Sequence, residues 1–213
     1  MPRRILVDIA WFFNALAVTA ALLHGFAYIL YMRQTKDGMS EPNSASWFVW
    51  AFLATLNAFN FRIIGGGALN ALQFFTGSLG CILTFLYALK VGKFEWPSRK
   101  EKQIVVLGVL ASLVWWIYQS AEYASIIIVV AFLLSFKPTL DGVKKDPSKE
   151  SPLPWVLWTA AFGLTTMNTI WRVQLGDAKL LGLVMPIVLL ICHATIAYLC
   201  RRQRKGSFDE RVA

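Results

Sequence analysis

The chain has 213 residues, of which 57% are apolar and 15% are charged, and its formal net charge is +9. This composition, with apolar stretches that approach or exceed about 17 residues, excludes an ordinary soluble domain and predicts an integral membrane protein. The polar gaps are short and leave no room for a separate soluble domain, so we expect residues 1–213 to form a single membrane domain.

The basic residues lie in short loops and at the C-terminus, where membrane orientation explains them better than nucleic-acid binding, which we do not expect. Cys81, Cys192 and Cys200 fall in apolar spans without metal-ligand spacing. We therefore interpret these cysteines as small buried residues and expect neither a disulfide nor a metal site.

Hydropathy predicts an all-α protein with seven transmembrane helices, each close to the ~20 residues that cross the hydrocarbon. In chain order they cover residues 6–32, 45–64, 67–89, 103–119, 121–137, 154–171 and 180–200. The fourth and fifth could instead be one very long helix, because only Gln119 to Glu122 interrupts the apolar run. Gly65, Gly66 and Gly67 are expected to form a short turn before the third helix, since no P-loop lysine follows them.

Loop charges decide between these alternatives. With seven spans, one side of the membrane holds 16 Lys and Arg residues and the other holds five. Fusing the fourth and fifth helices would move nine basic residues to the outer side, against the positive-inside rule. We therefore expect a multi-pass protein of the cell membrane, with the N-terminus outside and the basic tail 201–213 in the cytoplasm.

A proline-tryptophan junction occurs twice, as SEPNSASWFVW from Ser40 and as KESPLPWVLW from Lys149. Proline restricts the preceding residue to extended backbone conformations, and it fits the first turn of a helix. Each junction should therefore end a cytoplasmic loop and start a helix within about three residues. Trp47 and Trp155 are expected at the membrane interface with their ring nitrogens near water, and Trp50 and Trp158 one turn deeper, facing a cavity.

The two junctions belong to an internal repeat. A shift of 108 positions superposes Trp47 on Trp155, Trp50 on Trp158, Asn57 on Thr165 and Asn60 on Asn168. We therefore predict two three-helix units, 6–89 and 121–200, joined by a linker helix, 103–119. One linker helix gives both units the same orientation, so the arrangement is a 3+1+3 parallel repeat with its site between the halves.

This layout and the loop KPTLDGVKKDPSKESPLPWVLW resemble the PQ-loop superfamily, which includes SWEET sugar carriers, lysosomal amino-acid exporters and bacterial vitamin transporters. The family's proline-glutamine pair corresponds here to Pro138 and Thr139, and in the first repeat to Ala27 and Tyr28, so the motif is degenerate. The resemblance implies a seven-helix carrier. In such a carrier the hinges would be Pro42, Pro138, Pro152 and Pro154.

Polar residues at membrane depth are the candidate substrate-binding residues, and the alternative is that they bind other helices. The candidates are Trp50, Asn57, Asn60, Asn70, Gln73, Trp158, Thr165 and Asn168. Asn70 resembles an asparagine with which the sugar carriers bind their substrate, but its repeat counterpart is Ala178, which makes a sugar less favoured. The lone histidines His24 and His193 are either buried and hydrogen-bonded or part of a proton relay.

No nucleophile with its base, paired carboxylates or metal cluster can be assembled at membrane depth, so we expect neither an enzyme nor a bound cofactor. The pattern favours a small-solute transporter for a sugar, an amino acid or a vitamin-like polar metabolite. The alternative is a non-transporting receptor or an accessory subunit of a larger membrane complex. Expected partners are the solute, the lipid bilayer, and either a second copy of the chain or another membrane protein.

Overall fold

The computed structural model describes residues 3–42, 44–90 and 96–212, with side chains from residue 10 to residue 201 in these ranges. Within them every regular element is helical. The elements are α1 (Arg3–Lys36), α2 (Ser44–Ile64), α3 (Leu72–Lys90), α4 (Arg99–Tyr118), α5 (Ala121–Lys145), η1 (Pro147–Lys149), α6 (Pro152–Gln174), η2 (Leu180–Leu183) and α7 (Val184–Val212). The all-α prediction is confirmed.

Six segments of the described chain are long and apolar enough to cross a membrane: Ala10–Lys36, Ser44–Ile64, Leu72–Lys90, Arg99–Tyr118, Ala121–Lys145 and Leu180–Arg201. The protein is therefore multi-pass by length and composition. Helix α6 is long enough, at 23 residues, but is not among the six. The reason is its polar content, which includes Thr165, Asn168 and Arg172.

Several boundaries differ from the sequence-based ones. Helix α3 begins at Leu72 rather than at 67, because Gly66 and Gly67 have φ of 92° and 95° and turn the chain before the helix starts. Helix α5 continues through Pro138 to Lys145, and α7 runs through the expected tail to Val212. Residues 119–120 separate α4 from α5, with Gln119 in the left-handed region at φ 50°.

Both junction prolines precede or open a helix, as expected. Helix α2 begins at Ser44, two residues after Pro42, and Pro152 is the first residue of α6. A proline at this position costs the helix no hydrogen bond, because the first N–H groups of any helix have no acceptor within the helix.

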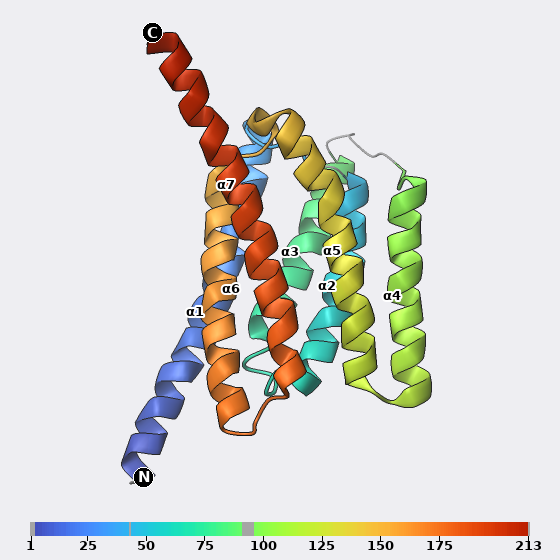
Figure 1. Cartoon of the computed structure of the whole chain (residues 1–213), viewed down its shortest axis with the longest axis vertical. Coiled ribbons are helices and arrows are strands. Elements are labelled where there is room, and N and C mark those ends of the chain that lie inside the picture. Colours follow the sequence, from blue (N-terminus) through green and yellow to red (C-terminus); the bar gives the residue numbers. More distant parts are fainter. Residues whose placement is uncertain (1–2, 43, 91–95, 213) are drawn as a thin grey trace.

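The helices stand side by side in an up-and-down bundle, with the chain ends at opposite faces (Figure 1). We call the end at which α1 begins the N-side and the end at which α7 terminates the C-side. Helix α3 packs against both α1 and α2, and α7 packs against both α5 and α6. Between these groups α1 packs against α6 and α2 against α5, while α4 lies outside, against α5 and α2.

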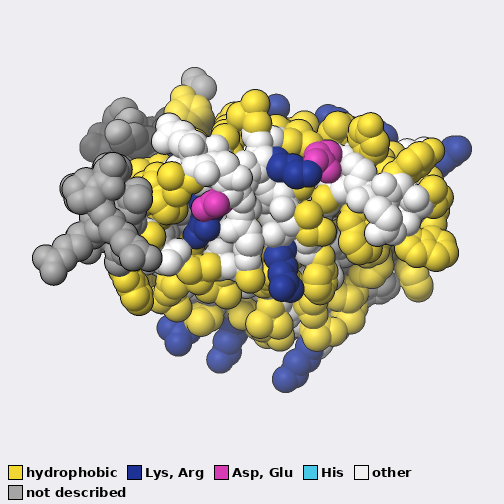
Figure 2. Space-filling model, turned by 90° about the horizontal axis from the view of Figure 1, so that it is seen from below, with side chains coloured by type: hydrophobic (Ala, Val, Ile, Leu, Met, Phe, Trp, Pro, Cys, Tyr) yellow, Lys and Arg dark blue, Asp and Glu magenta, His cyan; other side chains and the backbone are white. Residues whose placement is uncertain are grey.

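The N-side face carries few acidic side chains, and its basic side chains are scattered among apolar ones (Figure 2). One ion pair on this side joins Lys179 Nζ to Glu122 Oε1 and so links the α6–α7 connection to the start of α5. Arg172 of α6 donates to the carbonyl of Gly66, 3.1 Å away, and to Asn14 Oδ1, 3.0 Å away. These contacts hold the N-side ends of the helices together.

Candidate functional site: a central aromatic cavity

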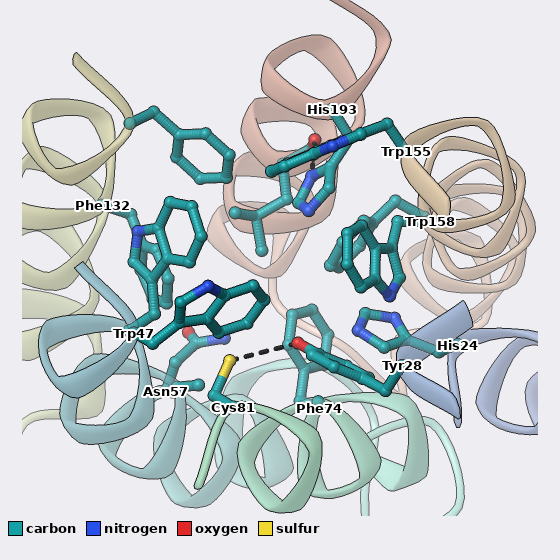
Figure 3. Close-up of a pocket in the computed structure, with 16 residues that line it drawn as sticks. His24, Tyr28, Trp47, Asn57, Phe74, Cys81, Phe132, Trp155, Trp158 and His193 are labelled. Carbon is teal, nitrogen blue, oxygen red and sulfur yellow. Dashed lines mark hydrogen bonds between the residues drawn. The ribbon is translucent and has the colours of Figure 1, made fainter. Parts of the chain in front are cut away.

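A cavity lies at the centre of the bundle, between α1, α2, α3, α5, α6 and α7 (Figure 3). Its volume is about 50 Å³, which admits a few water molecules and is well below the ~300–1,000 Å³ of small-molecule sites. The lining residues are His24, Tyr28, Trp47, Trp50, Ala54, Asn57, Phe74, Gly77, Cys81, Phe132, Phe136, Trp155, Trp158, Phe162, Leu189 and His193. The cavity is therefore too small in this structure for a sugar-sized solute.

Four tryptophans, two from each proline-tryptophan junction, line the cavity. The Trp47 and Trp50 rings lie 5.0 Å apart at 86°, and the Trp155 and Trp158 rings lie 5.1 Å apart at 79°. Each pair is edge-to-face, an arrangement that the ring quadrupoles favour by about 0.5–1.5 kcal/mol beyond burial. The two junctions therefore build the same local structure in both halves of the chain.

Two polar groups of the cavity wall have no hydrogen-bond partner within the described part of the chain. They are Nδ2 of Asn57 and Nε1 of Trp158, whose side chains are each 1% exposed. Leaving a buried donor unpaired costs about 1–3 kcal/mol. A cavity with such donors on its wall is suited to a guest that brings hydrogen-bond acceptors.

Two histidines face the cavity from α1 and α7, and neighbouring hydrogen bonds fix the tautomer of each. The amide nitrogen of Gln73 donates to Nδ1 of His24 at 2.8 Å, so the proton of this imidazole is on Nε2. Nδ1 of His193 donates to the carbonyl of Leu189 at 2.6 Å, which leaves Nε2 of His193 as an acceptor. The wall therefore carries one imidazole donor and one imidazole acceptor.

A polar network lies beside the cavity, toward the N-side, and ties α6 to α3 and the turn before it. Thr165 donates to the amide oxygen of Gln73, and Nδ2 of Asn168 donates to Oδ1 of Asn70 at 2.8 Å. Nδ2 of Asn70 in turn donates to Thr169 Oγ1 at 3.0 Å and to the carbonyl of Gly65. These bonds join the two halves of the chain.

The eight candidate residues are thus distributed over three places. Trp50, Asn57 and Trp158 line the central cavity. Asn70, Gln73, Thr165 and Asn168 lie in the polar network instead, because their side chains bond to one another. Asn60 lines a separate crevice between α2, α4 and α5.

The expectation that Trp47 and Trp155 lie at a wet interface is wrong. Their side chains are 3% and 1% exposed, and Nε1 of Trp155 donates to Oε2 of Glu150 at 3.1 Å. The physical reason is that the two junction loops cover each other on the C-side. The N–H of Glu41 donates to the carbonyl of Lys149 at 2.9 Å, and the N–H of Ser151 donates to Ser40 Oγ at 3.3 Å.

Glu150 is the residue that sequence reasoning missed as a candidate, although it stands just before the second junction. Its carboxyl group is buried and also accepts from the hydroxyl of Tyr31 at 3.0 Å, which links the loop before α6 to α1. Burial raises the pKa of Glu150 to about 8, although the two hydrogen bonds work in the opposite direction. The Tyr31 ring lies 5.1 Å from Trp47 and 5.7 Å from Trp158, so this contact packs against two tryptophans of the cavity wall.

The described side chains contain no cluster of three His, Cys, Asp or Glu residues that could hold a metal ion. Cys81, Cys192 and Cys200 are buried, in agreement with their interpretation as small buried residues. Comparison with protein-family models, with curated proteins and with solved structures finds no match for this chain.

Proposed function

We propose that the protein is a small-solute carrier of the cell membrane that binds its solute in the central cavity. The observation that carries the proposal is that repeat-related positions of the two halves supply most of the residues that line the cavity. Six pairs of wall residues are each separated by the same 108 positions: His24 and Phe132, Tyr28 and Phe136, Trp47 and Trp155, Trp50 and Trp158, Ala54 and Phe162, and Cys81 and Leu189. A site between two repeated units is the arrangement of many secondary transporters.

Helix packing supports the same repeat. Helix α3 contacts α1 and α2 as α7 contacts α5 and α6, and the contact of α1 with α6 has its counterpart in that of α5 with α2. A twofold axis that exchanges the units 6–89 and 121–200 accounts for both relations. With α6 as a seventh span and α4 as the linker, the architecture is a 3+1+3 parallel repeat of seven transmembrane helices.

The proposed orientation has the C-side in the cytoplasm and the N-terminus outside. The sequence-based topology assigns 16 of the 21 Lys and Arg residues to the side of the membrane that corresponds to the C-side. Positive charge accumulates on cytoplasmic loops, and this bias sets membrane topology. The contact of Glu150 with Tyr31 then closes the cytoplasmic side of the cavity.

The carrier proposal requires the cavity to open, because about 50 Å³ does not accommodate a sugar, an amino acid or a vitamin-like metabolite. The prolines Pro42, Pro138, Pro152 and Pro154 are the proposed hinges. Opening toward the cytoplasm would separate α1 from α6 and break the bonds of Glu150 to Tyr31 and between the junction loops. A carrier alternates between such states by moving one half against the other.

A ligand screen tests the proposal. The thermal midpoint of the purified protein is measured with panels of sugars, amino acids and vitamins, since a ligand that binds only the folded state must raise its stability. A hit is then tested for uptake into protein-containing liposomes. Phe162 narrows the cavity, so Phe162→Trp should abolish stabilisation and uptake together, with Phe48→Trp on the outer face of α2 as the matched control. Binding without uptake would favour the receptor alternative.

The second candidate is an accessory subunit of a membrane complex, and one feature favours it. Only four of the residues of helix α4 are buried: Glu101, Ile104, Gly108 and Ala111. The helix also exposes an apolar stripe that includes Val109, Leu113 and Trp116. A partner helix could pack on that stripe, although lipid suits it equally. Recovery of a stoichiometric partner from native membranes, with no solute that stabilises the protein, would establish this candidate in place of the carrier.

A further inference from the structure

A second hollow, larger than the central cavity and separate from it, lies on the N-side between α2, α4 and α5. Its volume is about 600 Å³, within the ~300–1,000 Å³ range of small-molecule sites. The walls are mostly apolar, with Leu56, Ile63, Trp115 and Ile128 among them, and they contain no acidic residue. In a bilayer this crevice opens onto acyl chains rather than water.

The crevice exists because α2 and α4 are held close toward the C-side only. A Cβ added at Gly108 would lie 2.5 Å from Cε1 of Phe52, so a larger residue there would require the Phe52 ring to move. Farther toward the C-side, Ser46 Oγ donates to Glu101 Oε1 at 3.2 Å. The crevice wall on α4 begins at Ala111, beyond this contact, where the two helices are no longer in close contact.

Asn60 places an unsatisfied amide on the crevice wall. Its side chain is 6% exposed, and neither Nδ2 nor Oδ1 has a hydrogen-bond partner within the described part of the chain. Its repeat counterpart Asn168, in contrast, donates to Asn70. An unpaired amide in the hydrocarbon is costly, so a guest with hydrogen-bonding groups would be stabilised at Asn60.

Arg62 gives the crevice a positive end. Its side chain is exposed and lines the crevice, and it has no ion-pair partner among the described residues, whereas Lys179 on the same side pairs with Glu122. Helix α2 ends at Ile64, so Asn60 and Arg62 lie within about 6 Å of the helix end along its axis. The 21 residues of α2 give a length of about 31 Å, close to the ~30 Å thickness of the hydrocarbon, so a spanning α2 would have its end near the glycerol and headgroups.

We propose that the crevice between α2, α4 and α5 is a binding site for one acidic phospholipid. The phosphate pairs with the Arg62 guanidinium, the glycerol region bonds to the Asn60 amide, and an acyl chain fills the apolar part beside Trp115. Arginine binds phosphate through two parallel hydrogen bonds, so the Arg62 guanidinium at the end of an apolar crevice suits an anionic headgroup.

Native mass spectrometry of the purified chain tests this site. The protein is titrated with phosphatidylglycerol and with phosphatidylcholine that carry identical acyl chains. We expect one phosphatidylglycerol to bind about tenfold more tightly than phosphatidylcholine, the ratio that 1.4 kcal/mol of charge-assisted bonding gives. Arg62→Gln should reduce that ratio toward one. Lys90→Gln, which removes an exposed charge from the last turn of α3 on the C-side, is the matched control and should leave it unchanged.

Ser112→Trp tests the tail rather than the headgroup, because Ser112 lines the crevice and an indole there occupies the acyl-chain space. It should abolish binding of the first lipid of either kind, while the thermal midpoint shows that the bundle is folded. The proposal falls if both lipids bind equally, if Arg62→Gln and Lys90→Gln weaken binding alike, or if a protein chain rather than lipid occupies this crevice in native membranes.

Discussion

Replacement of Glu150 by glutamine should remove a pH dependence from the stability of the protein. The folded protein holds the pKa of the buried Glu150 carboxyl at about 8, against an ordinary value of 4.5. The folded state therefore binds this proton more tightly than the unfolded state. Stability is complete below about pH 4.5 and falls as the pH rises toward 8, because ionisation in the folded state becomes a growing cost.

The size of the effect follows from the shift. One pKa unit corresponds to about 1.4 kcal/mol, so the whole shift amounts to about 5 kcal/mol of unfolding free energy, lost between about pH 4.5 and 8. In a chain of this length that is roughly 10–20 °C in the thermal midpoint. Glutamine is neutral throughout this range, so E150Q removes the slope while its amide oxygen still accepts one of the two bonds from Tyr31 and Trp155.

The assay is the thermal midpoint of the detergent-purified protein at pH 5, 6, 7, 8 and 9. Glu41→Gln is the matched control, because Glu41 occupies the corresponding place before the first junction but is half exposed and pairs with Lys149 at 3.6 Å. The wild type and E41Q should lose stability with rising pH, and E150Q should not. An E150Q protein with the slope of the wild type would refute the assignment of the slope to this carboxyl.

Four further substitutions test other parts of the bundle. Asn57→Leu should abolish the stabilisation by a bound solute, because leucine suits the membrane but offers no hydrogen bond. The thermal midpoint of the free protein should stay within a few degrees of that of the wild type. If the variant loses solute binding and stability alike, Asn57 is a structural residue. Gly80→Val should lower stability by about 1–3 kcal/mol, measured by thermal unfolding, because a Cβ at Gly80 would lie 2.2 Å from Cδ2 of Tyr28. Gln73→Leu should also cost about 1–3 kcal/mol in the same assay, because it leaves two buried partners unpaired. Pro154→Ala tests the proposed hinge. Uptake should fall, while hydrogen exchange should show that α6 still starts at the same residue. If uptake is unchanged, the junction is only a structural helix start.

Much of the fold could be predicted from periodicity and local chemistry. Several features depend only on residues that are close in sequence. They are the glycine turn at 65–67, the helix starts after Pro42 and at Pro152, and the break between α4 and α5. The largest shift of a helix start, from 67 to Leu72, has the same local origin, since the turn extends past its glycines. Local preferences determine such features, so a single sequence is enough to find them.

The site was less predictable because its bonds join distant residues that are not repeat counterparts. Asn70 and Asn168 are 98 positions apart, and Gln73 and Thr165 are 92 apart, so the shift of 108 cannot reveal either pair. Trp155 was expected near water because tryptophans near a helix start commonly lie at the membrane interface. Its burial depends on side chains from distant helices, since its ring lies 6.3 Å from Trp50 and 5.5 Å from His193.

The two halves contribute different chemistry to a cavity of twofold shape. In four of the six repeat-related pairs the first half supplies a polar or small residue, His24, Tyr28, Ala54 or Cys81, and the second half supplies Phe132, Phe136, Phe162 or Leu189. Asn57 adds an amide to the wall, whereas its counterpart Thr165 is bonded to Gln73. Groups that can hydrogen-bond nevertheless come from both halves, His24 and Asn57 from the first and Trp158 and His193 from the second, and they lie among aromatic rings. In the proposed carrier such a wall would favour a solute that has both polar and apolar surface, because a fully polar solute would leave hydrogen-bonding groups unpaired against the rings. Since repeat-related positions carry different side chains, the proposed carrier would bind an asymmetric solute in one orientation.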